Sequence, residues 1–228
     1  GGIPIIETLD GALASVQVNQ VWGILNGTSN YILTKMEQEG GDFQEILKEA
    51  QDLGYAESDP ALDIEGYDTA HKIALLSSMC FGQHIDYSQI SVEGITRIQK
   101  LDALFALHHD FSIRLLGVAH RGDKCVDVRV HPALLPQDNL LTHVRDVYNA
   151  IYLVGDPVGN LMLYGRGAGS LPTGSAVVSD LIQLARGENT GLERHEVFLR
   201  PGLPQRAIEE VISPFYVRCP VTDTPTSL

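Results

Sequence analysis

The sequence predicts an α+β fold, in which a mainly antiparallel or mixed sheet is covered by helices on one face. Apolar residues recur at helical spacing in several segments of the first half, whereas from Ser112 onward they alternate with polar residues. The first pattern is typical of amphipathic helices and the second of half-buried strands. The chain has 228 residues, of which 44% are hydrophobic, enough to bury one large core. Helices packed on one face of such a sheet form an α+β layer.

The chain begins with a short predicted helix and a strand. Residues 7–15 favour a helix, and residues 16–25 alternate and are rich in valine, as strands are. An Asn-Gly pair follows, and apolar residues then recur at helical spacing. This helix is expected to be capped by Thr28, Ser29 or Asn30. Its free N–H groups would suit an anion or a carbonyl ligand, but plain capping explains the pattern equally well.

The next two predicted helices are separated by a proline signal. Residues 42–53 favour a helix, with the aspartate at its start as N-cap and Gly54 as its stop. Asp59-Pro60 is a helix-start signal, because proline fits the first turn, where its missing N–H group costs nothing. Helical apolar spacing then runs from Ile64 to about residue 82.

The segment over residues 53–72 concentrates titratable side chains. They are Glu57, Asp59, Asp63, Glu65, Asp68, His71 and Lys72. Asp68 and Lys72 lie four positions apart, so they share one helix face, at the edge of an apolar stripe. The pair is either an ordinary surface ion pair, contributing about 0.3–0.5 kcal/mol, or an acid and a lysine held for chemistry. The spacing alone leaves both interpretations open.

The second half of the chain predicts two hairpins. Their strands cover residues 112–120, 125–131, 149–154 and 161–164. Each pair flanks a short polar or glycine-containing turn, which is typical of antiparallel neighbours. With the strand near the N-terminus they make a sheet of four or five strands. Short helical pieces are expected before the hairpins, over residues 86–90 and 101–107.

A glycine-rich segment, residues 165–170, lies between the last strand and a helix predicted over residues 173–186. Glycines such as Gly167 and Gly169 allow close backbone approach to a ligand, and equally a tight strand-to-helix turn. The segment lacks the lysine of a P-loop, and its glycine spacing is only a weak dinucleotide signal. The eight histidines show no HxH or HExxH grouping, so no transition-metal site is predicted.

Residues 1–187 are predicted to form one folded unit. Beyond it the sequence is polar and irregular up to residues 215–223, which have the pattern of a strand. Residues 188–228 are therefore expected to comprise a linker and the first strand of another module. The opening GGIPII has neither a methionine nor a basic n-region, so we interpret it as a cut inside a longer polypeptide rather than a signal peptide.

Composition restricts the partners of the chain. A formal net charge of −13 disfavours nucleic acid and anionic membranes. No run of eighteen apolar residues predicts a membrane span. Three widely spaced cysteines without a CxxC pattern suit a reducing compartment, so we expect a cytoplasmic location.

Three segments together resemble the homoserine dehydrogenases: residues 23–33, 53–72 and 165–180. The middle one is the most specific, since its acid, Asp-Pro, Asp, Gly, Asp and Lys follow the family signature in order and spacing. The resemblance extends over about residues 1–187. It implies reduction of aspartate 4-semialdehyde to homoserine with NADPH or NADH, carried out on an amino-acid substrate.

The resemblance assigns roles to the acidic segment. Lys72 matches the general acid that protonates the carbonyl oxygen as hydride arrives. Glu57 and Asp68 match the residues that hold the substrate's ammonium group, and Asp63 falls among the substrate-binding positions. Carboxylates suit that task because they accept charge-assisted hydrogen bonds.

The resemblance also implies cofactor and sodium contacts. The cofactor positions are Gly54, Glu57, Gly167 and Gly169. Gly1 and Ile3 match two backbone-carbonyl ligands of a sodium ion, whose other ligands would precede Gly1. The sodium site implied here is therefore incomplete.

The family carries a dinucleotide-binding half and a further catalytic lysine that have no counterpart in this chain. The segment from Phe215 resembles the opening of an ACT regulatory domain. The chain is thus expected to be inactive alone and to form a homodimer through its sheet. Two alternatives stay open: a non-catalytic amino-acid sensor, against which Lys72 argues because a sensor needs no proton donor, and a dimerisation scaffold.

Overall fold

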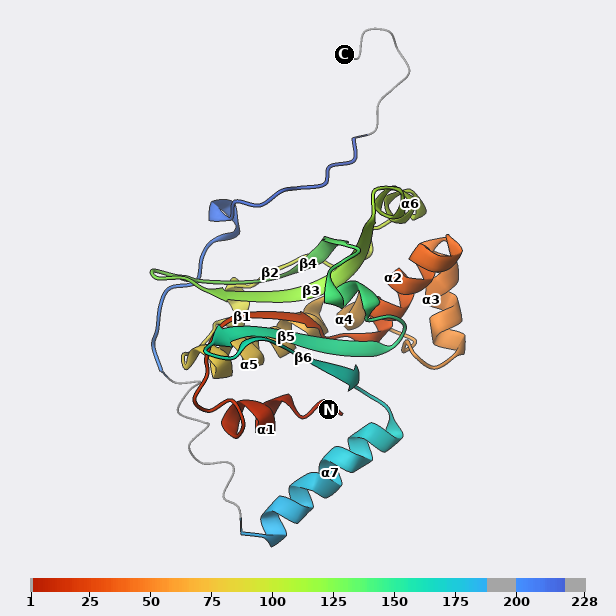
Figure 1. The fold of residues 1–228 in the computed structure, drawn as a ribbon. Helices are drawn as coiled ribbons and strands as arrows, with labels where there is room; N and C mark the ends of the chain where they lie inside the picture. Colours follow the sequence, from red (N-terminus) through yellow and green to blue (C-terminus); the bar gives the residue numbers. More distant parts are fainter. Residues whose placement is uncertain (1, 188–199, 220–228) are drawn as a thin grey trace, which may run out of the picture.

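The computed structural model describes residues 2–187 and 200–219, and a six-stranded sheet lies at their centre (Figure 1). Along the chain the strands are β1 (Gln17–Ile24), β2 (Ser91–Val92), β3 (Phe111–Arg121), β4 (Val126–Pro136), β5 (Tyr148–Asp156) and β6 (Gly159–Arg166). In space they lie in the order β2-β4-β3-β1-β5-β6. Neighbours pair antiparallel, except that β2 runs parallel to β4. The predicted α+β fold with a mainly antiparallel, mixed sheet is confirmed.

Both predicted hairpins are present, β3–β4 and β5–β6. The sheet has six strands rather than the predicted four or five. The additional strand is β2, which is only two residues long, so it is too short for any alternation to show in the sequence.

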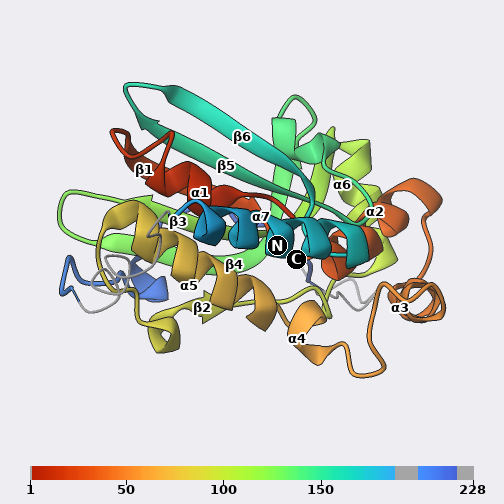
Figure 2. The same ribbon diagram turned by 90° about the horizontal axis from the view of Figure 1, so that it is seen from below.

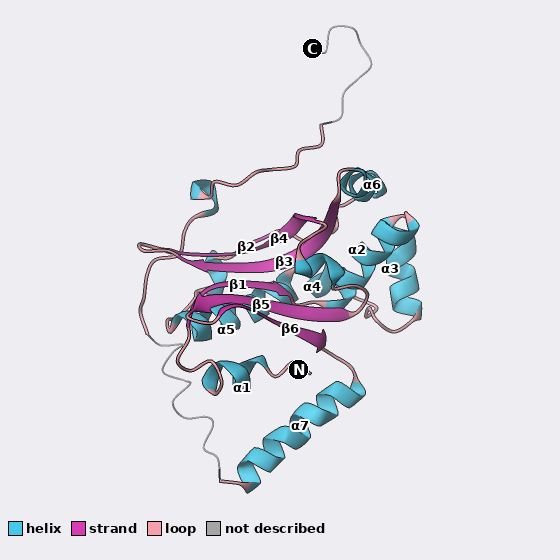
Figure 3. Ribbon diagram, in the orientation of Figure 1, coloured by secondary structure: helices cyan, strands magenta, loops and turns pink. Residues whose placement is uncertain are grey.

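The helices of the described residues are α1 (Ile5–Asp10), α2 (Gly27–Glu39), α3 (Phe43–Asp52), α4 (Ala61–Ile64), α5 (Tyr67–Phe81), α6 (Lys100–His108) and α7 (Ser170–Ala185) (Figure 3). In the described part of the chain three short 3₁₀ helices accompany them: η1 (Tyr87–Gln89), η2 (Leu140–His143) and η4 (Ile208–Glu210). Most of the predicted helices are found within a few residues of their expected ends, but the first ends at Asp10, where Gly11 is its C-cap, rather than at residue 15.

Helices cover one face of the sheet, as predicted. Val21 of β1, Leu115 of β3 and Val128 of β4 belong to the same buried core as Ile32 of α2 and Ile73 of α5. Figure 2 shows α5 running alongside the strands on this side. The packed helices α2 and α5 both begin near the end of β1, and this convergence places the candidate site.

The opposite face of the sheet carries a smaller apolar cluster. Ile24, Leu116 and Leu141 are buried there, and Trp22 and Tyr152 are partly buried beside them. Within the described part of the chain, η2 packs over one end of this face, and the remainder is open. We call it the open sheet face.

The long helix predicted from Ile64 is interrupted, so that prediction is wrong at its start. α4 ends at Ile64 and α5 begins at Tyr67, because Gly66 between them has φ +88°, a left-handed conformation that glycine adopts at no steric cost. A Cβ atom on Gly66 would also lie 3.2 Å from Val92 and 3.3 Å from Val130. The close packing on β2 and β4 therefore favours glycine there as well.

Residues 200–210 return along the edge of the sheet. The Val126 N–H group donates to the Pro204 carbonyl at 2.9 Å, and the Gln83 side chain hydrogen-bonds the Leu203 backbone at both amide atoms. Residues 211–219 form neither helix nor strand, so the strand predicted from Phe215 is absent in its described part. Among the described residues, no strand of the sheet pairs with residues 215–219. The remainder of the predicted strand lies outside the described residues, and the boundary at residue 187 stays a prediction.

Helix α7 extends away from the sheet (Figure 1) and has no buried residue. Apolar side chains such as Leu171, 86% exposed, and Leu184, 69% exposed, lie on its surface. Within the described residues, no helix combines the length and apolar character that crossing a membrane requires.

Candidate active site

The candidate site forms where β1 ends, because three helix beginnings meet there. The chain passes from Ile24 through Leu25 to Asn26, which starts α2, and α4 and α5 pack against this turn. Buried Ser29 ties the turn to α4 by donating its hydroxyl to the Asp63 carbonyl at 2.8 Å. The acidic segment is thus held against the end of the central strand.

Lys72 makes a second contact besides its ion pair with Asp68. Its Nζ donates to Asp68 Oδ2 at 2.6 Å and to the Leu25 carbonyl at 3.0 Å. The second contact comes from β1's end, 47 positions earlier in the chain. The Lys72 side chain is 49% exposed and that of Asp68 is 29% exposed, so the pair is fixed by the fold while it still faces solvent.

Asn26 is a site residue that the sequence analysis missed. Its Nδ2 donates to Asp63 Oδ1 at 2.6 Å and to Asp68 Oδ2 at 2.8 Å, and its Oδ1 accepts the Ser29 N–H at 2.8 Å. Asn26 is therefore the N-cap of α2, and the predicted caps at Thr28, Ser29 or Asn30 are wrong. Asparagine is a preferred N-cap, and that preference could have identified the cap but not the acidic partners.

The two acids are brought together, and each keeps one oxygen without a hydrogen bond among the described residues. Asp68 Oδ2 accepts from both Asn26 and Lys72, and within the described residues no hydrogen bond reaches its Oδ1. In the same part of the chain, the Asp63 carboxylate accepts a hydrogen bond at Oδ1 but none at Oδ2. Carboxylate oxygens left without a hydrogen bond at a solvent-accessible site are suited to a cationic group, because hydrogen bonds from such a group are charge-assisted.

Glu57 and Gly54 lie on the exposed loop between α3 and α4. The Glu57 side chain makes no hydrogen bond within the described residues, although its carbonyl accepts from Gln51 Nε2 at 3.0 Å. Gly54 has φ +75° and open space around it. Thr28 at the start of α2 donates to the Tyr55 carbonyl at 2.8 Å and so anchors this loop beside the site. Within the described residues, no hydrogen bond or ion pair joins the Glu57 side chain to Asp68 or Lys72.

The glycine-rich segment packs beside the same end of β1. Asn149 donates to the Ile24 carbonyl at 3.0 Å, and a Cβ atom on Gly167 would lie 2.3 Å from Asn149 Oδ1. Gly169 has φ +117° and ψ 156°, a conformation that essentially only glycine adopts. Packing at Gly167 and backbone conformation at Gly169 thus each explain why glycine stands there. A tight turn between strand and helix accounts for the segment.

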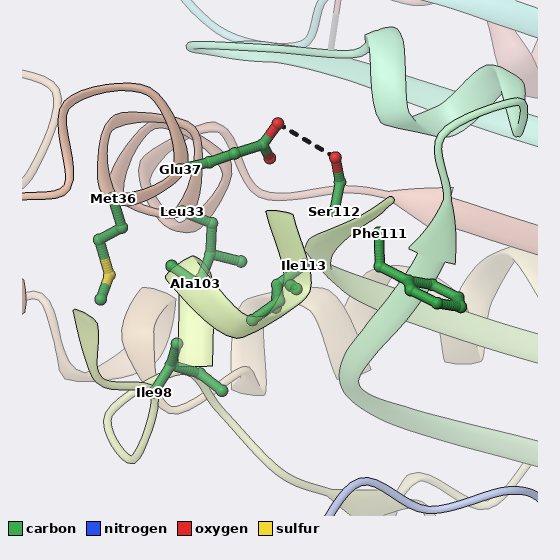
Figure 4. Close-up of a pocket in the computed structure, with 9 residues that line it drawn as sticks. Leu33, Met36, Glu37, Ile98, Ala103, Phe111, Ser112 and Ile113 are labelled. Atoms are coloured by element: carbon green, nitrogen blue, oxygen red, sulfur yellow. Dashed lines mark hydrogen bonds between the residues drawn. The ribbon is translucent and has the colours of Figure 1, made fainter. Parts of the chain in front are cut away.

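Two hollows lie elsewhere. One, between α2, α6 and β3, holds about 10 Å³, roughly one water molecule, and Glu37 points toward Ser112 at its wall (Figure 4). The other, of about 410 Å³, lies on the open sheet face and is lined by Trp22, Leu140 and Tyr152, among others. Neither includes Asp63, Asp68 or Lys72. The partly exposed side chains of Lys72 and Asp68 leave the acidic site accessible from solvent.

Metal ligands are sparse. The described residues contain no group of three His, Cys, Asp or Glu side chains that could hold a metal ion. Of the two predicted sodium ligands, Gly1 lies outside the described residues, and the Ile3 carbonyl accepts the Ile5 N–H at 2.9 Å. A carbonyl oxygen has two lone pairs, so this contact leaves one of them available.

Comparison with known proteins gives one answer. Residues 4–182 match the sequence profile of the homoserine dehydrogenase family. The chain is 42% identical to a homoserine dehydrogenase of Neisseria gonorrhoeae over 100% of this chain and 54% of that protein. It is also 42% identical to one of Helicobacter pylori, over 98% of this chain and 52% of that protein. The chain thus spans about half the length of these curated relatives.

Solved structures agree with the sequence comparison. A homoserine dehydrogenase from Thiobacillus denitrificans superposes with a TM-score of 0.86 at 40% identity, over 92% of this chain and 50% of that one. A hyperthermophilic archaeal homoserine dehydrogenase mutant in complex with NADPH gives a TM-score of 0.70 at 29% identity, over 84% of this chain and 55% of that one. The chain therefore belongs to the homoserine dehydrogenase family.

Proposed function

We propose that this chain is the substrate-binding and catalytic part of an enzyme that reduces L-aspartate 4-semialdehyde to L-homoserine with NADPH or NADH. The observation that carries the proposal is Lys72, held by Asp68 and the Leu25 carbonyl at the end of β1. The family and the NADPH complex of the archaeal relative support the choice of cofactor.

Asp68 would hold the ammonium group of the substrate. Its Oδ1 is free among the described residues, while Oδ2 is fixed by Asn26 and Lys72. Asp63, joined to the same Asn26, would contribute its own free oxygen. Glu57 would complete the grip from the exposed loop, which a bound substrate and cofactor would bring closer.

Lys72 would donate the proton. A lysine ammonium has three N–H donors, and Lys72 uses two of them in the structure. The third would serve the aldehyde oxygen, which gains negative charge as the carbonyl carbon is reduced. The nicotinamide cofactor, when bound, supplies the hydride. Lys72 then gives up its proton to the nascent alkoxide, and a neutral hydroxyl is formed.

The cofactor would approach the same end of β1. Gly54, Glu57, Gly167 and Gly169 are the residues proposed to contact it, since the two glycine-containing loops border the site. Gly54, with open space around it, allows the closest approach. Most of the dinucleotide would be bound by a separate cofactor-binding half, for which the net charge of −13 makes this chain a poor substitute.

The function is tested by turnover in the presence and absence of that half. The chain joined to the dinucleotide-binding half of the Neisseria relative is expected to oxidise NADPH when aspartate semialdehyde is added, whereas the chain alone is not. Turnover by the chain alone, close to that of the joined protein, would refute the proposal that a separate half binds most of the cofactor. A joined protein that binds homoserine in calorimetry without any turnover would favour the amino-acid sensor.

Sodium and location remain predictions. The Ile3 carbonyl would be one sodium ligand and Gly1 another, and the ion would brace the start of the chain without taking part in proton transfer. The three cysteines are free, which suits a cytoplasmic location.

We further propose that a second copy of this chain covers the open sheet face. The partly buried Trp22 and Tyr152 leave an apolar surface there, and a two-fold axis lets such a surface pair with itself. Sedimentation should give twice the chain mass at micromolar concentration, and Trp22→Asp should give the monomer. Gln44→Asp, at an exposed position of α3, adds the same charge as a control and should leave the dimer intact. A wild-type monomer at high concentration would contradict the proposal.

A further inference from the structure

Asn26 uses every polar atom of its side chain. Oδ1 accepts the Ser29 N–H at 2.8 Å and so caps α2, while Nδ2 donates to Asp63 at 2.6 Å and to Asp68 at 2.8 Å. An amide nitrogen carries two N–H groups, so one is available for each acid. Asn26 is only 6% exposed, so these bonds are shielded from competing water.

Capping alone does not require asparagine. Aspartate and serine cap helices about as well, and in this chain Asp42 caps α3 and Asp86 caps η1. What distinguishes asparagine is its pair of donors. At α2 those donors meet two carboxylates that come from 37 and 42 positions further along the chain.

The two N–H donors of Asn26 offset the electrostatic repulsion between the Asp63 and Asp68 carboxylates. Two neighbouring carboxylates disfavour each other's ionised form and turn away from each other unless donors hold them. The Asn26 amide supplies one hydrogen bond to each and fixes the spacing between them. Because Asn26 and Lys72 both bind Oδ2 of Asp68, that carboxylate cannot rotate without losing two hydrogen bonds.

We propose that Asn26 is a positioning residue, which aims the free oxygens of Asp68 and Asp63 at the ammonium group of the substrate. This inference rests on the proposed function and deepens it. Asn26 touches no reacting atom in this scheme. It acts through the acids and, by fixing Asp68, through Lys72.

Two substitutions at Asn26 keep the cap and remove the donors. In the complete enzyme, Asn26→Ser should raise the Kd for homoserine and the KM for aspartate semialdehyde by roughly 10–100-fold, the worth of a hydrogen bond to a charged group. kcat at saturating substrate should change much less. Asp42→Ser makes a matched cap exchange on α3 and should leave both constants unchanged.

Asn26→Asp adds a readout that a capping role would not move. It places a third carboxylate beside Asp63, Asp68 and the Lys72 ammonium, and three neighbouring carboxylates cannot all stay ionised. The acidic limb of the kcat/KM pH profile should therefore move to higher pH. Should Asn26→Ser prove unstable, the Asn26→Asp profile decides the question.

The outcomes separate the inference from the function on which it rests. Variants that melt like wild type, bind homoserine as tightly and keep its pH profile would reduce Asn26 to a helix cap and overturn the inference. A wild-type enzyme that turns over while this happens leaves the proposed function intact. A wild-type enzyme with no turnover on the semialdehyde would overturn the proposed function instead, whatever the variants do.

Discussion

Replacing Lys72 with alanine in the complete enzyme is expected to lower kcat by roughly 10²–10⁴-fold, the usual contribution of a positioned general acid. The reason is the geometry of Nζ, which two hydrogen bonds fix at the end of β1 while one donor stays available. Steady-state kinetics with matched melting curves measures the effect. A folded Lys72→Ala enzyme with near-wild-type kcat would remove Lys72 from the mechanism.

The chain offers a control for this prediction. Lys48 and Asp52 form the same four-residue spacing on α3, with side chains 76% and 68% exposed. Lys48→Ala should leave turnover unchanged and alter stability by no more than about 0.5 kcal/mol. Changes at Asp68 should chiefly weaken substrate binding, with Asp68→Asn milder than Asp68→Ala because it keeps one acceptor oxygen. Glu57→Gln should resemble the Asp68 changes.

Glu37→Ala is expected to destabilise the fold by about 3–5 kcal/mol, because it leaves a buried charge without its partner. Arg114 has a side chain with 0% exposure, and it donates to Glu37 Oε2 at 2.7 Å. The same guanidinium also binds the carbonyls of Ile113 and Thr142, each at 2.8 Å. The pair therefore joins α2 to β3 and to η2 on the other side of the sheet.

Denaturant unfolding checks this prediction, and Glu39→Ala serves as its control. Glu39 lies on the same helix, 57% exposed, and pairs with Lys35 at 2.7 Å. Losing an exposed pair should cost at most about 1 kcal/mol. If both substitutions cost the same, the buried pair is not what seats α2 on the sheet. Because Asn26 is the N-cap of α2, a loosened α2 should also weaken homoserine binding.

Local patterns predicted most of the fold. The hairpins were foreseeable because alternation and turn residues act over a few positions, and α3 and its Asp42 cap follow from the same local rules. The break at Gly66 was not foreseeable, since a glycine between helical residues does not reveal a left-handed φ. The local pattern at Phe215 favoured a strand, yet a strand also needs a partner edge that the pattern cannot supply.

Only part of the candidate site could be predicted from the sequence. Asp68 and Lys72 could be paired because one turn of helix separates them. The Leu25 carbonyl and Asn26 could not be added, because their contacts join the end of a strand to a helix more than 35 positions away. Only the folded sheet brings β1 and α5 together. Glu57 shows the opposite case, a residue assigned by resemblance whose side chain makes no hydrogen bond within the described residues.

A crystal structure of the complete enzyme with homoserine bound would test the proposed roles of Asp68 and Lys72 most directly. The ammonium nitrogen is expected about 2.7–2.9 Å from Asp68 Oδ1, and the hydroxyl oxygen within hydrogen-bond distance of Lys72 Nζ. Asn26 should keep its bonds to Asp63 and Asp68. Homoserine bound with its ammonium group away from both acids, or with its hydroxyl out of reach of Lys72, would contradict these roles.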